Sequence, residues 1–215
     1  MGRRRLFRGA AGGAGVLLTV HAKTALGSGL CKSPSAMMSG NTSPRPNSGI
    51  TCSGGRSPGF WKVPKHFSNW GAAGATVPTF NVVVSLCATG MQNLALSDLL
   101  TQGTFLTTAG FVGAPANTGL WAVLAFPNSF DNGQLLRHLS AAWLNAGVFT
   151  SASQKYPLTR SQINDMWMAT KAPGGLYCPT SIGTCTTGWN ATQVISYISG
   201  MYDINDGLGP NLCKP

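Results

Sequence analysis

The stretch QLLRHLSAAWLNAG, residues 134–147, carries the clearest helical pattern in the chain. Its apolar residues recur at intervals of three and four, which places them on one face of an α-helix. This stripe is formed by Leu135, Leu139, Ala142 and Ala146, with Leu136 and Trp143 beside it. Gly147 predicts the end of the helix, because glycine often follows the last turn. The stretch is the first indication of a mainly α-helical domain.

Two further helices are predicted downstream, in YPLTRSQINDMWMATKAPGG at 156–175 and NATQVISYISGMYD at 190–203. Both begin with a polar residue followed three positions later by glutamine, which is the spacing of a capping box. The capping pairs are Thr159 with Gln162 and Asn190 with Gln193. Pro173 and the glycine after it end the first of these helices.

Signals for other elements are weaker. Short helices are predicted at 93–101 and 119–125. The only β-branched run is TFNVVVSLC at 79–87, which fits a strand, a buried coil or a helix. We therefore predict a small, irregular, mainly α domain with long disulfide-stapled loops and few or no strands.

The chain divides into three parts by composition. Residues 27–58 are rich in Gly, Ser and Pro and lack an apolar rhythm, which predicts an irregular segment or linker. Residues 59–215 form the predicted helical domain. Residues 1–26 have a basic start, a small and apolar middle and a small-residue cleavage candidate around Val20 to Ala22. They predict an export signal, and a basic arm retained in the mature protein is the alternative.

The order RRRLFR at residues 3–8 resembles a twin-arginine signal. The same N-terminal segment also carries half of the net charge of the chain. The formal net charge is +10, from 15 basic and 5 acidic residues. Five of the basic residues lie in the first 23 positions, so the remainder carries 10 basic and 5 acidic residues, or +5. The charge distribution does not favour a nucleic acid as partner.

Charged residues make up only 9% of the chain, and glutamate is absent. An ordinary soluble domain has about 25%. A surface with so few charges depends on small polar residues for solubility, or is covered by a partner, by glycans or by other copies of the chain. The composition is thus the first indication of assembly. After residue 26, no apolar run is long enough to predict a membrane span.

The six cysteines are even in number, and none has the C-x-x-C spacing of metal sites or thiol oxidoreductases. Three disulfides are predicted, which favours a secreted or cell-surface location; free thiols in a reducing cytoplasm are the alternative. Cys178 and Cys185, in CPTSIGTC, bracket a short loop and are predicted to pair. The other four cysteines could form two disulfides in three different ways; they are Cys31, Cys52, Cys87 and Cys213.

Three blocks carry a resemblance: SPGFWK at 57–62 with a cysteine upstream, LLRHLSAAWLNA at 135–146, and YPLTRSQI at 156–163. Their order resembles a group of exported bacterial proteins with a Cys-x-PGFWK-like motif and helices starting LLRH and YPLT. The resemblance implies an exported or surface-attached protein and transfers no catalytic residue. This chain has Val63-Pro64 where an Asn-His pair is common in the group. Any role that the group's histidine has at this position is therefore in doubt for this chain.

The stretch CSGGRSPGFWKVPKHFSNW, residues 52–70, concentrates aromatic and basic side chains. Rings beside cations bind sugars, bases and anionic polymers. The alternative is that the rings are core residues packed between helices, which requires no ligand. The candidate binding residues are Arg56, Phe60, Trp61, Lys62, Lys65 and Trp70.

Catalytic patterns are scarce. Outside the predicted signal the histidines are His66 and His138, and no G-x-S-x-G elbow marks a nucleophile. His138 borders the apolar stripe of 134–147, where a structural hydrogen bond is expected. We predict no catalytic residue, no metal site and no cofactor.

These observations favour a non-catalytic, secreted or cell-surface structural protein that assembles with itself into a fibre, sheath or layer. The first alternative is a module that binds carbohydrate or another cell-envelope polymer through residues 56–70. An exported hydrolase based on His66 or His138 and a virion protein with a retained basic arm are further alternatives.

Overall fold

A computed structural model describes residues 32–39, 53–87, 91, 93–151, 154–183, 185 and 187–202 of the chain. Within these ranges the fold is mainly α-helical, as predicted, with two small antiparallel sheets of two strands each. The predicted export signal at 1–26 lies outside the described residues. So do three of the six cysteines, Cys31, Cys52 and Cys213.

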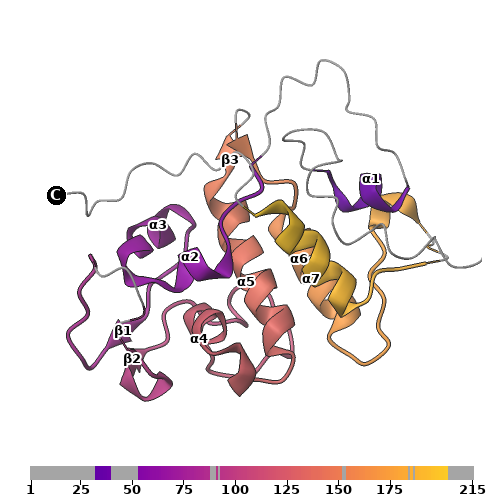
Figure 1. Cartoon of the computed structure of the whole chain (residues 1–215). Helices are drawn as coiled ribbons and strands as arrows, with labels where there is room; N and C mark the ends of the chain where they lie inside the picture. Colours follow the sequence, from indigo (N-terminus) through magenta and orange to yellow (C-terminus); the bar gives the residue numbers. More distant parts are fainter. Residues whose placement is uncertain are drawn as a thin grey trace, which may run out of the picture.

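The central element is helix α5, Gly133–Val148, which contains the opening stretch (Figure 1). Its apolar stripe is buried, including Leu135, Leu139 and Ala142. Five helices contact it: α2 (Pro58–Lys62), α3 (Ser68–Ala72), α4 (Leu120–Ala125), α6 (Arg160–Thr170) and α7 (Ala191–Met201). Because α5 is covered on several sides, the domain is organised around it.

Gly147 does not end α5, contrary to the prediction. The helix continues through Gly147 to Val148. A Cβ at Gly147 would collide with the backbone oxygen of Ala73 and the guanidinium of Arg160. The glycine therefore allows neighbouring groups to approach the helix closely, which sequence alone does not distinguish from a terminating role.

Both predicted capping boxes are confirmed. Thr159 Oγ1 accepts from the Gln162 N–H at 3.2 Å, and the Gln162 side chain accepts from the Thr159 N–H at 2.9 Å. Asn190 and Gln193 form the same pair of bonds before α7, at 3.0 and 2.9 Å. These contacts satisfy backbone donors that have no partner within the helix. Helix α4 also confirms the short helix predicted at 119–125.

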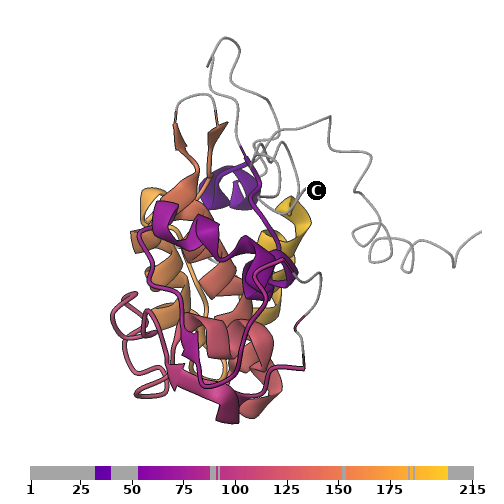
Figure 2. The same cartoon turned by 90° about the vertical axis from the view of Figure 1, so that its left-hand side faces the viewer.

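The strands differ from the sequence prediction. The β-branched run contributes only β1, Thr79–Phe80, which pairs with β2, Leu99–Thr101. The helix predicted at 93–101 is wrong: a 3₁₀ turn at Leu96–Asp98 leads directly into β2. A second hairpin, β3 (Thr150–Ser151) with β4 (Gln154–Lys155), was not predicted, because two-residue polar strands carry no periodicity. The two sheets lie at opposite ends of the molecule (Figure 1, Figure 2).

Further short helices complete the described part of the chain. Helix α1, Pro34–Met38, lies in the segment predicted to be irregular. It forms there because Ser33 accepts a hydrogen bond from the Ala36 N–H at 3.3 Å and proline occupies the first turn. The 3₁₀ turns are η1 (Pro64–His66), η2 (Leu96–Asp98), η3 (Pro127–Ser129) and η4 (Thr180–Ile182). None of the helices in the described ranges is long and apolar enough to cross a membrane.

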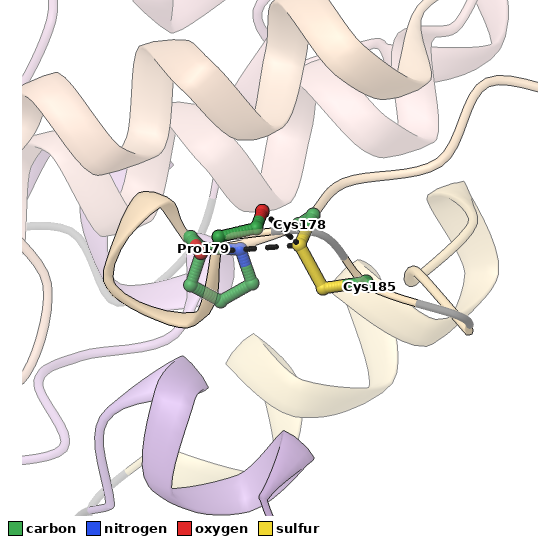
Figure 3. Close-up of a disulfide and its surroundings, with 4 residues drawn as sticks. Cys178, Pro179 and Cys185 are labelled. Carbon is green, nitrogen blue, oxygen red and sulfur yellow. Dashed lines mark hydrogen bonds between the residues drawn. A yellow bond between two sulfur atoms is a disulfide. The ribbon is translucent and has the colours of Figure 1, made fainter.

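The predicted bond between Cys178 and Cys185 is confirmed (Figure 3). It closes the loop that contains η4. Next to it, Tyr177 and Trp189 exchange two backbone hydrogen bonds of 2.7 and 2.9 Å. Cys87 is also disulfide-bonded.

Candidate functional site

The aromatic and basic stretch is anchored to α5 by the buried side chain of Asn145. The Arg56 N–H donates to Asn145 Oδ1 at 2.9 Å, and Asn145 Nδ2 donates to the Arg56 carbonyl at 2.9 Å. The amide thereby pairs with one residue's backbone at two points. This contact fixes the chain just before α2.

Three tryptophan indoles hold α2 in place from inside. Trp61 Nε1 donates to Asn145 Oδ1 at 3.0 Å, and Trp70 Nε1 donates to the Trp61 carbonyl at 3.1 Å. Trp121 Nε1 donates to the Lys62 carbonyl at 2.9 Å. Trp61 and Trp70 are fully buried, and their indole donors are satisfied within the protein. These two rings are core residues, as the structural alternative predicts.

The other four predicted binding residues, Arg56, Phe60, Lys62 and Lys65, are partly exposed. The structure adds His66, whose ring stacks on Phe60 with 3.7 Å between centroids. The guanidinium carbon of Arg56 lies 4.8 Å from the centre of the Phe60 ring. We call Arg56, Phe60, Lys65 and His66 the Phe60 cluster.

The Phe60 cluster is positively charged. Burial, followed by the charges of Lys65 and Arg56, lowers the pKa of His66 from 6.5 to about 4. At neutral pH the imidazole is therefore uncharged, and the charge of the cluster comes from Arg56 and Lys65. The sequence from residue 53 to 87 contains no Asp or Glu.

His138, the other candidate histidine, contacts the end of α7. Its Nδ1 lies 2.9 Å from the Tyr202 hydroxyl, and the two rings stack with 5.9 Å between centroids. Burial, then the charge of Arg137, lowers the pKa of His138 from 6.5 to about 4. The contact joins α5 to α7, which gives His138 a structural role at neutral pH.

The three sequence blocks of the resemblance meet around α5. The first two are joined through Asn145, and the third supplies Tyr156, whose buried phenol neighbours that amide. Burial raises the pKa of Tyr156 well above its ordinary value. Arg160, also of the third block, places its guanidinium 3.4 Å from the centre of the Trp143 ring and donates to the Ala73 carbonyl. The blocks are thus linked by buried polar contacts and cation–π contacts.

Sequence reasoning missed Asn145 and Tyr156. The available signal was a fully polar amide within an otherwise apolar helical stretch, because a buried amide requires partners. Within the described ranges, no group of three His, Cys, Asp or Glu side chains is arranged to hold a metal ion.

Comparisons of the chain with protein-family models, curated proteins and solved structures found no match.

Proposed function

We propose that this chain is a non-catalytic, secreted or cell-surface structural protein that assembles with copies of itself. The observation that carries the proposal is an exposed, uncharged apolar surface beside β1 and β2. It is formed by Val82 (44% exposed), Val83 (98%), Leu86 (58%) and Leu100 (69%), which we call the ribbon surface.

The strand pairing brings the parts of the ribbon surface together. Thr79 lies opposite Thr101 and Phe80 opposite Leu99, and the Asn81 N–H donates to the Asp98 carbonyl at 2.9 Å. Asn81, which follows β1 and precedes Val82 and Val83, is thereby held beside the start of β2. Large apolar side chains grouped in this way are uncommon on a solvated monomer and typical of an interaction site.

A second copy suits this surface in both charge and hydropathy. Residues 79–101 contain one charged side chain, Asp98, whose carboxylate accepts a hydrogen bond from the Ala95 N–H at 2.8 Å, so two copies that meet here bring few like charges together. Burying a valine or leucine side chain contributes about 1.5–3 kcal/mol. Self-association through the ribbon surface is therefore favoured.

Sedimentation velocity across a range of concentrations tests the proposal. The wild-type protein should form oligomers, and the double variant Val83→Lys/Leu100→Lys should shift toward monomer. Met168→Lys/Leu176→Lys is the matched control, because it places the same two charges at exposed apolar side chains (48% and 55%) outside the ribbon surface. A wild-type protein that stays monomeric at its highest soluble concentration would contradict the proposal.

The secreted location has its own test. Export into an oxidising compartment predicts that native material carries disulfides throughout and has lost its N-terminal segment. Intact mass of the native protein, measured before and after reduction, reports both properties. Free thiols together with an intact Met1 would contradict this part of the proposal.

A further inference from the structure

We propose that the Phe60 cluster is a surface site for an acidic polysaccharide bearing sulfate or carboxylate groups. Arg56 and Lys65 would contact the acidic groups, while the stacked rings of Phe60 and His66 would support the two cations from below. This site is separate from the ribbon surface, and it does not depend on self-assembly.

The site is pre-organised by the core beneath it. Both backbone groups of Arg56 are bonded to Asn145 at 2.9 Å, so the position of the arginine does not depend on a ligand. Phe60 packs edge-to-face on the buried Trp61 ring with 5.2 Å between centroids. A cluster fixed in this way loses little conformational entropy when it binds, which favours affinity for an extended polymer.

Charge selects an anion. Arg56 and His66 both contact the Phe60 ring, the charge of Lys65 acts on His66, and no acidic residue occurs between residues 53 and 87. Burial is the main cause of the neutral state of His66, and repulsion by Lys65 and Arg56 adds to it, so both cations act on the same small region. A sulfate or carboxylate placed there would relieve that repulsion and accept charge-assisted hydrogen bonds.

The geometry favours a charged polysaccharide over neutral sugars and over nucleic acid. Neutral sugars and single-stranded bases bind by stacking on an open aromatic face. His66 already stacks on Phe60 at 3.7 Å, and Trp61 and Trp70 are fully buried. The cluster therefore offers charge at its surface more than a stacking platform.

Calorimetric titration with dextran sulfate and with uncharged dextran tests the site, because the two polymers share a backbone and differ in charge. Binding of dextran sulfate alone is expected. Arg56→Gln/Lys65→Gln should weaken it about tenfold, since losing one surface charge contact costs roughly two- to fivefold. Lys171→Gln is the control and should leave binding unchanged. Lys171 follows the last residue of α6 and donates to the Val112 carbonyl, outside the Phe60 cluster. Lys65→Gln alone tests the site if the double variant does not fold.

A second measurement reports on the cluster directly. In an NMR titration of the whole protein, dextran sulfate should raise the pKa of His66 above its value of about 4. The groups that face this imidazole are Lys65 of η1 and Arg56 before α2, and the bound anion offsets both. His138 has a similar pKa of about 4 away from the cluster and is the internal control.

Three results would overturn the proposal. The first is an unchanged pKa of His66 at saturating dextran sulfate. The second is equal weakening by Lys171→Gln and by the double variant. The third is binding of oligo(dT) as tight as that of dextran sulfate and equally sensitive to the double variant, which would assign the site to nucleic acid.

Discussion

Trp61 and Asn145 are 84 residues apart in the sequence, yet the Trp61 indole donates a hydrogen bond of 3.0 Å to the Asn145 side chain. The same oxygen accepts from the Arg56 N–H, and the Asn145 amide nitrogen donates to the Arg56 carbonyl. One buried side chain on the central helix thus fixes both the residue before α2, Arg56, and the tryptophan near the end of α2.

Replacing Asn145 with alanine should therefore destabilise the protein severely. The change leaves the Arg56 N–H, the Arg56 carbonyl and the Trp61 indole without this partner. Each buried polar group left unsatisfied costs about 1–3 kcal/mol. Because the two Arg56 bonds are only partly buried, we expect a loss in the lower part of the sum for three groups, about 3–5 kcal/mol in the free energy of unfolding. Urea unfolding followed by tryptophan fluorescence measures it. Asn81→Ala, at an exposed site, is the control and should change stability little.

Gly55 gives a second test of the same contact. Its φ is +73°, and a Cβ there would collide with the Asn145 side chain. Gly55→Ala should therefore cost about 2–4 kcal/mol, from backbone strain and overpacking together. Gly71→Ala is the matched control, because Gly71 lies in α3 with nothing within 4 Å of its missing Cβ. The control should be neutral or stabilising by up to about 1 kcal/mol. Equal effects of the two substitutions would show that the approach of Gly55 to Asn145 is not tight.

The disulfide should stabilise its loop locally. Cys178 and Cys185 are seven residues apart, and a loop this short is expected to contribute about 2 kcal/mol. The double variant Cys178→Ser/Cys185→Ser should lower the melting temperature, measured by calorimetry without reductant so that the bond at Cys87 stays intact. Ser181→Ala, an exposed change in the same loop, is the control. An unchanged melting temperature in the double variant would contradict this prediction.

The helices were predictable where their signals are local. The capping pairs at Thr159 and Asn190 and the apolar stripe of α5 each depend on residues three or four positions apart, and the structure confirms all three. Gly147 was misjudged because its role depends on Ala73 and Arg160, which are distant in sequence or on another element. The sequence predicts a helix where β2 lies, because the partner that makes β2 a strand, β1, is about twenty residues away.

The candidate site was predictable only in composition. Sequence reasoning found the concentration of rings and cations at 56–70, but burial separates Trp61 and Trp70 from Phe60, and no periodicity in so irregular a segment predicts which ring faces inward. His66 was considered as a catalytic candidate, whereas its observed contact is a stack on Phe60. Asn145 was overlooked because its partners lie more than eighty residues away.

The His138–Tyr202 contact predicts a specific dependence of stability on pH. The pKa of His138 is about 4 in the folded protein and about 6.5 in the unfolded chain, so the unfolded state binds the proton first as the pH falls. The contribution of His138 to the free energy of unfolding is therefore fully present above about pH 6.5 and is lost progressively as the pH falls from about 6.5 to 4. Because the ring keeps part of its contact with water, we expect His138 to account for about 1–2 kcal/mol of this loss.

Urea unfolding at pH 7 and at pH 4.5, compared between the wild-type protein and His138→Gln, isolates this contribution, because the other titrating groups are common to both. The variant should lose less stability than the wild type over this interval. His66→Gln is the matched comparison, since His66 has a similarly lowered pKa, and the two variants should act additively because the histidines have no shared partner in the described contacts. If His138→Gln shows the full wild-type loss, the imidazole is not held neutral by its site between α5 and α7.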